Sequence, residues 1–132
     1  MECIFCKIVK GEIPSFKVWE DEKHLAFLTI RPTREGHTLV IPKVHSEYLF
    51  EMDDNDLSIL SLVSKKVAKI LVEVLFPNSG KVGLVVAGLE VPHTHIHLIP
   101  MDSEQDLSFS RAKDASSEEL QKVLDKIKSF VE

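Results

Sequence analysis

The chain has 132 residues and a formal net charge of −5, with 44% hydrophobic and 28% charged residues. These values are typical of one globular domain over residues 1–132, and the negative charge argues against a general nucleic-acid-binding surface. No apolar run approaches the ~20 residues of a membrane-spanning helix, and Glu2 and Cys3 stand where a signal peptide needs positive charge and then an apolar core. We therefore expect a cytoplasmic protein that binds neither membranes nor nucleic acids.

The first part of the chain predicts a short helix followed by three strands. Residues 3–10 indicate a helix that ends at a glycine, a residue suited to the position just after a helix. Residues 16–20 and 25–30 are rich in apolar and β-branched side chains and are joined by a charged turn, which predicts two strands. Residues 37–41 predict a third strand.

The longest predicted element is an amphipathic helix in the middle of the chain. It begins at Asp53 or Asp54, either of which can cap a helix N-terminus. Its apolar residues recur every three or four positions, as in a helix that packs one face on a core. Residues 77–80 contain proline, asparagine and glycine, which stop the helix.

The last part of the chain predicts a fourth strand at residues 82–86 and a fifth that contains several histidines. Residues 102–115 are polar and predict an exposed loop, and the capping box Ser-Ser-Glu-Glu at 116–119 opens a last helix over 116–131. This order of elements predicts an α+β fold, an antiparallel sheet of about five strands with the long helix packed on it.

Three histidines at every second position are the most informative feature of the sequence. His95 and His97 alternate with Ile96 and Leu98, and His93 precedes them, which is the period of a strand buried on one side. Side chains at i, i+2 and i+4 share a face, so the three imidazoles would line one surface. Such a cluster suits nucleophilic, acid–base or metal chemistry. The alternative is a polar strand face open to water.

The two cysteines of the chain, Cys3 and Cys6, lie close together near its N-terminus. A structural disulfide would be out of place in a cytoplasmic protein. The Cys-x-x-Cys spacing instead suits either a pair of metal thiolates or a redox couple.

Taken together, these motifs resemble the histidine triad (HIT) family of nucleotide hydrolases and transferases. The resemblance is carried by the His-x-His-x-His string, by Gly-His-Thr-Leu-Val-Ile-Pro-Lys at 36–43 and by Ile-Phe-Cys-Lys-Ile at 4–8, and it covers residues 3–101. It implies a HIT-like fold whose sheet pairs with a second subunit in a homodimer. It also implies attack by the middle histidine on the α-phosphate of a small nucleotide substrate.

The resemblance implies a role for each of three histidines. His95 would be the nucleophile, and a neutral imidazole is competent in that role because its ordinary pKa is about 6.5. For its Nε2 to attack, a backbone carbonyl should hold the proton on Nδ1. His97 would donate to a non-bridging phosphate oxygen and stabilise the charge that develops there. His37 would orient His97 or contact the phosphate, or else make only a structural hydrogen bond.

The resemblance also implies a structural zinc ion and an apolar nucleoside pocket. Two thiolates and two imidazoles make a closed tetrahedral site, and the family positions for these ligands are filled by Cys3, Cys6, His45 and His93. Without metal, both cysteines would simply be reduced. The family lines the base with apolar side chains at the positions of Phe5, Ile8, Ile13, Phe27 and Ile30. Each of these residues fits a plain core role equally well.

Two further nucleotide-binding positions depart from the family pattern. Thr29 stands where the family usually has an aspartate that binds the ribose hydroxyls, so a charge-assisted contact is lost. Glu90 stands where a serine or threonine commonly contacts the phosphate or assists the leaving group. An ionised carboxylate repels a phosphate, whereas one with a raised pKa can act as a general acid.

Three functional hypotheses follow. The first is a zinc-stabilised, dimeric nucleotidyl hydrolase that acts through His95 on a nucleoside 5′-monophosphate derivative, such as a phosphoramidate or a dinucleoside polyphosphate. The second is a nucleotide-binding or interaction module with little catalysis. The third is a hydrolase with a catalytic metal on the three histidines, in which removing the metal would abolish activity directly.

Overall fold

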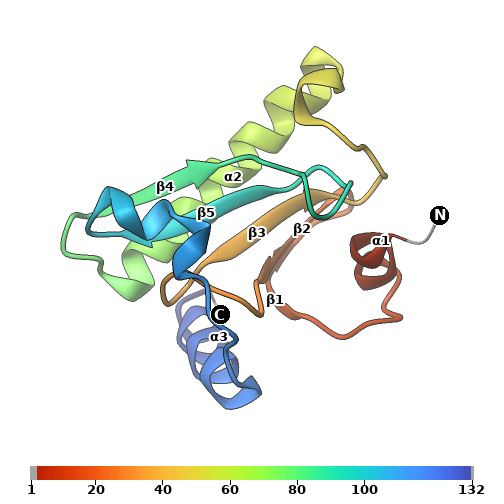
Figure 1. Cartoon of the computed structure of the whole chain (residues 1–132). Coiled ribbons are helices and arrows are strands. Elements are labelled where there is room, and N and C mark those ends of the chain that lie inside the picture. The colour runs from red at the N-terminus through yellow and green to blue at the C-terminus, as the bar shows by residue number, and fades with distance from the viewer. Residues whose placement is uncertain (1–2, 132) are drawn as a thin grey trace.

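The computed structural model describes residues 3–131, and a five-stranded antiparallel sheet forms its centre (Figure 1). The order of the strands across the sheet is β1-β2-β3-β5-β4. The strands are β1 (Phe16–Glu20), β2 (His24–Leu28), β3 (Thr38–Pro42), β4 (Lys81–Val85) and β5 (Ile96–Met101). The predicted α+β fold is confirmed; the first predicted strand has the observed boundaries, and those of the next three differ from the observed ones by one or two residues.

Two helices cover one face of the sheet. Helix α2 (Asp54–Leu75) begins where predicted, because the side chain of Asp53 accepts a hydrogen bond from the Asp56 backbone N–H at 2.8 Å. Its buried stripe packs on β-strand side chains that include Val40 and Leu98. Helix α3 (Ser117–Val131) packs against β1 and α2. No helix within residues 3–131 is long and apolar enough to cross a membrane, and the cytoplasmic location stays a prediction.

The predicted capping box opens α3. The Glu119 backbone N–H donates to the Ser116 hydroxyl at 3.1 Å, and the Ser116 N–H donates back to the Glu119 carboxylate at 3.3 Å. The two bonds satisfy donors that a helix N-terminus leaves without partners.

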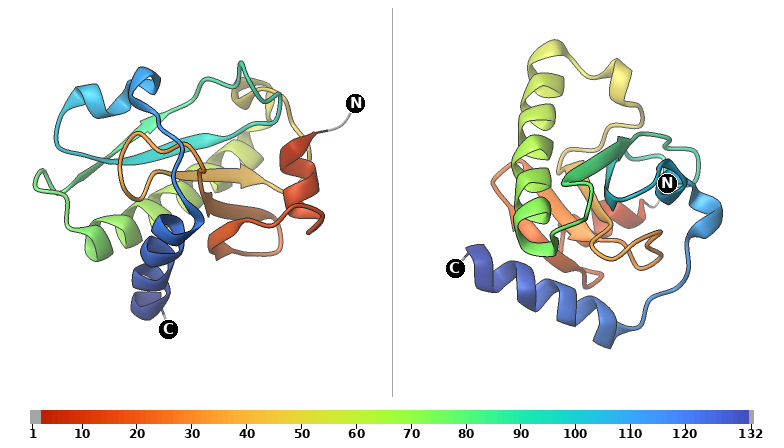
Figure 2. Two further views of the ribbon diagram at one scale, coloured as in Figure 1. Left: turned by 60° about the horizontal axis from the view of Figure 1, so that its bottom comes forward. Right: turned by 90° about the vertical axis from the view of Figure 1, so that its left-hand side faces the viewer.

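The opposite face of the sheet is covered by the short helix α1 (Ile4–Val9) and by the segment after β5. Phe5 and Ile8 of α1 are buried in a second core against side chains of β2 and β3. Alternate residues of these two strands therefore face α1 and α2, which explains why both strands are buried along their whole length. Figure 2 (right) shows α2 on one side of the sheet and the segment after β5 on the other.

That segment is the one predicted as an exposed loop, and it has short helical turns of its own. Residues 102–115 contain two short 3₁₀ helices, η2 (Glu104–Leu107) and η3 (Phe109–Arg111). Most of their side chains are exposed, but the carboxylate of Asp106 is buried. A capping box at Ser103 opens η2, so local hydrogen bonds shape a segment that has no apolar period.

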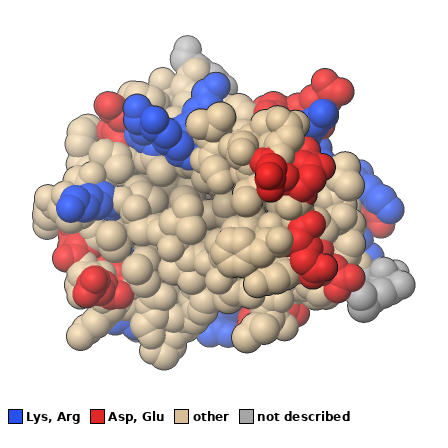
Figure 3. Space-filling view, turned by 90° about the horizontal axis from the view of Figure 1, so that it is seen from above, with Lys and Arg blue, Asp and Glu red and all other residues tan. Residues whose placement is uncertain are grey.

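The outer edge of β4 is the edge of the sheet next to the histidine-bearing strand. Within residues 3–131, β4 pairs with β5 alone, and Leu84, its last residue but one, is 55% exposed. Figure 3 looks toward this edge and shows a broad central area without charged side chains, with lysine, arginine and acidic residues around it.

Candidate active site and metal centre

The three histidines of the string lie at the start of β5 and in the loop before it. His97 is in the strand, whereas His93 and His95 precede it, so the predicted strand is wrong over the first half of the string. Pro42 explains the difference. It is the last residue of β3, and its nitrogen carries no proton to continue the ladder with the chain before β5.

The three imidazoles nevertheless share the sheet face that α1 covers. The ring of Phe5 lies 5.9 Å from the ring of His93 and 5.1 Å from that of His95, in edge-to-face contacts. The rings of His95 and His97 are 4.9 Å apart. His97 pairs in register with Leu39, which belongs to the same second core. The pleat of β5 therefore places His97 beside the other two.

The hydrogen bonds of His95 define which of its nitrogens is free. Its Nδ1 lies 2.7 Å from the backbone carbonyl oxygen of His93. A carbonyl oxygen only accepts hydrogen bonds, so Nδ1 carries the proton and donates it. In a neutral ring the lone pair then resides on Nε2. This is the tautomer that a nucleophilic histidine needs.

A chain of three groups defines the tautomers of His37 and His97. The backbone N–H of Thr33 donates to Nδ1 of His37 at 3.1 Å, so the proton of a neutral His37 is on Nε2. His37 Nε2 lies 2.9 Å from His97 Nδ1 and donates to it. The remaining proton of a neutral His97 is therefore on Nε2. Nε2 of His97 is thus a free N–H donor, whereas Nε2 of the neighbouring His95 carries a free lone pair.

Burial keeps these imidazoles neutral. It lowers the pKa of His37 to about 4, and together with the smaller effects of nearby His95 and His37 it lowers that of His97 to about 3. Burial also lowers the pKa of His95, while its hydrogen bond to His93 and the charge of Glu90 raise it. At neutral pH the three rings therefore keep the tautomers that their hydrogen bonds define.

A second cluster joins α1 to the sheet. The ligand atoms of Cys3, Cys6, His45 and His93 all lie within 4.8 Å of one another. Nδ1 of His93 is 3.3 Å from Cys3 Sγ and 3.3 Å from His45 Nδ1, and Cys6 Sγ is 3.4 Å from His45 Nδ1. A tetrahedral zinc ion separates two nitrogens by about 3.4 Å and a nitrogen from a sulfur by about 3.6 Å. The cluster can therefore hold a metal ion of this kind.

His93 is already oriented for a role as a metal ligand. Its Nε2 lies 2.9 Å from the carbonyl oxygen of Pro42, which must accept the Nε2 proton and so leaves the lone pair on Nδ1. Metal-binding histidines commonly donate their other N–H to a carbonyl in this way. The same ring is fully buried, whereas His45 is exposed.

The five apolar residues predicted to line a nucleoside pocket divide into two groups. Phe5, Ile8 and Phe27 are buried in the second core, and Ile13 packs at its edge. Ile30, in contrast, is 66% exposed after the end of β2. Core packing accounts for the first four residues, whereas only Ile30 has most of its surface exposed.

The two positions that depart from the family pattern both lie in loops. The hydroxyl of Thr29 accepts a hydrogen bond from the backbone N–H of Arg31 at 3.2 Å, so it is engaged locally. Arg31 forms an exposed ion pair with Asp114 at 3.1 Å. Glu90 is exposed between β4 and β5, where its charge acts on His95.

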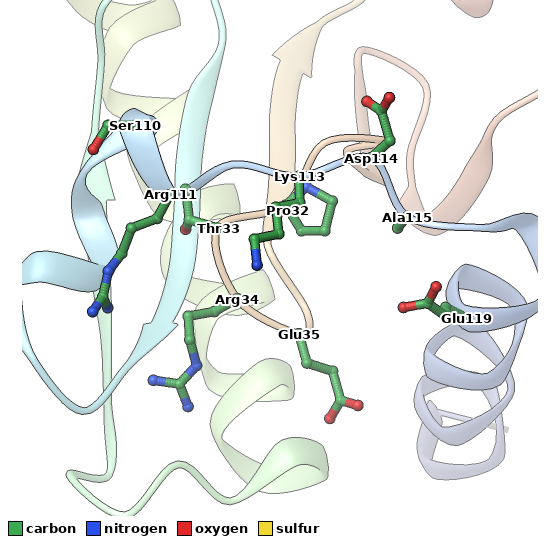
Figure 4. A pocket seen from close by; sticks show the side chains of 10 residues that line it. All are labelled: Pro32, Thr33, Arg34, Glu35, Ser110, Arg111, Lys113, Asp114, Ala115 and Glu119. Atoms are coloured by element: carbon green, nitrogen blue, oxygen red, sulfur yellow. The ribbon is translucent and has the colours of Figure 1, made fainter.

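Two neighbours of the histidines were missed by sequence reasoning. The ring of Phe109 lies 4.7 Å from that of His97, and the backbone of Thr33 holds His37. Thr33 also lines an open hollow of about 670 Å³ between the β2–β3 loop and residues 110–115 (Figure 4). No residue of the histidine string lines this hollow. Neither neighbour had a sequence signal, because both lie in segments without apolar period or motif.

The fold and the site together define a class of protein. Its members have an antiparallel sheet with neutral imidazoles on one face, one offering a lone pair and the next an N–H donor, beside a Cys₂His₂ cluster. The model of the HIT domain family matches residues 10–104. The chain therefore belongs to the HIT family.

Individual relatives agree with this assignment. A HIT-like protein of Borreliella burgdorferi is 44% identical over 115 residues, which cover 83% of this chain and 83% of that protein. The adenosine 5′-monophosphoramidase of Saccharomyces cerevisiae is 44% identical over 106 residues, which cover 78% of this chain and 65% of that enzyme. The crystal structure of a zinc-bound histidine triad family protein from Mycobacterium smegmatis superimposes with a TM-score of 0.79 at 29% identity, covering 99% of this chain and 96% of that one.

Proposed function

We propose that this chain is a nucleotidyl hydrolase that cleaves a nucleoside 5′-monophosphate derivative at its α-phosphate. The observation that carries the proposal is the free lone pair on Nε2 of His95, which follows from the 2.7 Å hydrogen bond between its Nδ1 and the His93 carbonyl. The name of the yeast relative, an adenosine 5′-monophosphoramidase, supports a phosphoramidate as the substrate class. A dinucleoside polyphosphate offers the same reacting phosphorus.

The reaction proceeds in two displacements. Nε2 of His95 bonds to phosphorus while the bond from phosphorus to the leaving group breaks, and the leaving group departs with the electron pair and takes a proton from solvent. The nucleotidyl-imidazolium keeps its Nδ1 proton on the His93 carbonyl. Water then attacks phosphorus, loses a proton and releases the nucleoside 5′-monophosphate, which restores neutral His95. An acceptor other than water would make the same protein a transferase.

His97 and His37 stabilise the charge that develops on the phosphate. The Nε2 proton of His97 is free to bond a non-bridging oxygen, where a fixed donor is worth most in the transition state. His37 holds that proton in place, because its own Nε2–H occupies the other nitrogen of His97 at 2.9 Å. His37 is therefore a positioning residue.

We propose zinc as the metal of the cluster formed by Cys3, Cys6, His45 and His93. A donor set of two thiolates and two imidazoles suits zinc, and four protein ligands leave no coordination position for substrate. The zinc-bound relative from Mycobacterium smegmatis supports this choice. When bound, the ion would supply structure and no chemistry.

We propose a homodimer formed through the outer edge of β4. Unpaired strand edges favour pairing with another chain, and Leu84 exposes an apolar side chain there. The uncharged area around this edge (Figure 3) fits a self-complementary two-fold contact.

The decisive test compares His95→Ala with a matched variant of a histidine outside the site. His24→Gln is that control, because His24 is buried beside Asp21 and takes no part in the cluster. We expect His95→Ala to lose hydrolysis of adenosine 5′-phosphoramidate by at least about 10³-fold, the scale of removing a nucleophile, while it stays folded. Wild-type protein quenched in alkaline denaturant, in which a phosphorus–imidazole bond survives, should carry one nucleotidyl group by mass spectrometry. Wild-type turnover in His95→Ala would end the proposal.

A second candidate is a nucleotide-binding module with little catalysis. It is favoured by the locally engaged hydroxyl of Thr29 and by the charge of Glu90 near the phosphate site. Calorimetry with AMP beside the hydrolysis assay separates the two. Tight binding without turnover and without a covalent adduct after alkaline quench supports the module.

A further inference from the structure

The segment after β5 lies across the face of the sheet that bears the histidines. We call residues 102–111 the covering segment; Figure 2 (right) shows it on the side opposite α2. Gly83 of β4 allows it to approach, because a Cβ at this position would lie 2.5 Å from Cδ2 of Leu107. Leu107 therefore packs directly on the backbone of β4.

The buried carboxylate of Asp106 anchors the covering segment. Its Oδ2 accepts hydrogen bonds from the backbone N–H of Asp102 at 2.9 Å and of Ser103 at 3.0 Å, and from Arg34 Nη1 at 2.6 Å. Its Oδ1 accepts from Arg111 Nη1 at 2.8 Å. These bonds, chiefly the one from the Asp102 backbone, lower the pKa of Asp106, so the anchor stays ionised.

The anchor links two segments that both contact the catalytic histidines. Figure 4 shows Arg34 and Arg111 extending from facing segments, the β2–β3 loop and η3. The β2–β3 loop also contains Thr33, whose backbone N–H holds His37. Asp106 thus fixes the covering segment to the same loop that defines the tautomer of His37.

Phe109 is the residue that the covering segment brings to the site. Its ring centroid lies 4.7 Å from that of His97, with 47° between the ring planes. His97 also contacts the rings of His95 at 4.9 Å and His37 at 5.2 Å. Phe109 is therefore the one aromatic hydrocarbon ring among the described ring neighbours of His97.

We propose that Phe109 is a positioning residue that confines the His97 ring to the orientation in which Nδ1 accepts from His37 and Nε2–H remains free for substrate. A single hydrogen bond leaves an imidazole able to rotate about its χ2 bond, and a second ring in contact with it, tilted by 47° at a centroid distance of 4.7 Å, restricts that rotation. The idea rests on the proposed function only for the use of the free N–H. The orientation itself is a property of the protein without substrate.

The same contact covers part of the half-buried His97 ring, and Phe109 itself is 42% exposed. The titratable groups that act on His97 are His95 and His37, and both disfavour its protonated form. On the covering segment, Asp106 and Arg111 are engaged with each other. Removing the Phe109 ring therefore changes mainly burial, and a hydrated His97 gains a proton more readily. Protonation would place a second hydrogen against the Nε2–H of His37 and break the arrangement.

The test compares Phe109→Ala, Phe109→Leu and Phe130→Ala, where Phe130 is a half-exposed phenylalanine on α3. Two-bond ¹H–¹⁵N spectra of the imidazoles report tautomer and titration without substrate, and steady-state kinetics with adenosine 5′-phosphoramidate report kcat and KM. In Phe109→Ala we expect mixed His97 tautomers, a His97 pKa raised by about one unit and kcat reduced about tenfold with KM within about twofold. Phe109→Leu should restore most of both readouts, and Phe130→Ala should match the wild type.

An unchanged tautomer and titration of His97 in Phe109→Ala would overturn the inference, whatever happens to kcat. A loss of kcat in Phe130→Ala of the same size would overturn it as well, because the effect would then be general. Absence of turnover in the wild type would reject the proposed function alone. The spectra would still decide the role of Phe109.

Discussion

Removing metal from the cluster of Cys3, Cys6, His45 and His93 is expected to release α1 from the sheet before the rest of the protein unfolds. The two cysteines lie at the start of α1 and within it, whereas the two histidines lie beyond β3 and before β5. An ion held by all four therefore ties the helix to the sheet. A chelator removes that tie without altering any side chain.

The size of the effect follows from what else holds α1. Ordering its six residues costs about 1–2 kcal/mol each, or about 6–12 kcal/mol. Burial of Phe5 and Ile8 contributes about 1.5–3 kcal/mol each, and the few backbone hydrogen bonds of so short a helix contribute about 1 kcal/mol each. These terms nearly cancel, so α1 is marginal without metal. Structural zinc contributes about 10–16 kcal/mol in small peptides, enough to keep the helix closed.

Hydrogen exchange measured by mass spectrometry provides the assay. We expect residues 3–10 of metal-loaded protein to exchange at least about 100-fold more slowly than after chelation, and α2 to exchange equally in both states. Turnover should fall with the loss of α1, because Phe5 packs 5.1 Å from the ring of His95. Equal exchange of residues 3–10 with and without chelator would refute the reasoning. Loss of activity with α1 still protected would point to a metal that acts on substrate.

Three further predictions concern single residues. Burial lowers the pKa of His37 to about 4, below about 6.5 in the unfolded chain, so the unfolded state binds the proton first and stability falls as pH drops from about 6.5 to about 4. Urea melts should show a smaller loss over this interval in His37→Gln, and equal losses would contradict the assignment. Glu90→Ser removes a negative charge near His95 and is expected to lower KM for a nucleotide about threefold at low salt, an effect that should fade at high salt; a KM independent of both changes would exclude that repulsion. Leu84→Lys places a charge on the outer edge of β4 and should weaken dimerisation by about 10- to 100-fold in light-scattering titrations. A monomeric wild type, or a dimeric variant of unchanged affinity, would reject the β4 interface.

Local sequence signals predicted most of the fold. Asp53 caps α2 and the Ser116–Glu119 capping box opens α3, because a cap depends on side chains within one turn of the helix. The strands of the sheet were predicted from their apolar composition, which is also a local signal. The residues at 77–80 predicted roughly where α2 ends. They did not predict that Phe76, just before the proline, ends it in a left-handed conformation.

What the sequence could not show depended on contacts between distant segments. The predicted strand included His93 and His95, but β5 begins only at Ile96. The proline that interrupts the pairing, Pro42, lies 51 residues before His93 and could not be connected to it from local sequence. The contact of Phe109 with His97 depends on Asp106, whose partner Arg34 is 72 residues away. The cysteines and histidines of the site were predictable from their spacing in the sequence. The tautomers of the histidines were not, because they depend on where backbone carbonyl and N–H groups lie in the fold.

His93 links the proposed metal site to the proposed catalytic site without being a ligand shared by both. Its Nδ1 faces the two thiols, its Nε2 donates to the Pro42 carbonyl, and its own carbonyl accepts the Nδ1 proton of His95. A catalytic metal on all three histidines would need one lone pair from each ring directed at a common point. Instead, His93 directs its lone pair at the thiols, and Nδ1 of His97, the nitrogen that carries its lone pair, accepts a hydrogen bond from His37. The geometry therefore favours a nucleophilic imidazole oriented by the backbone of a metal ligand.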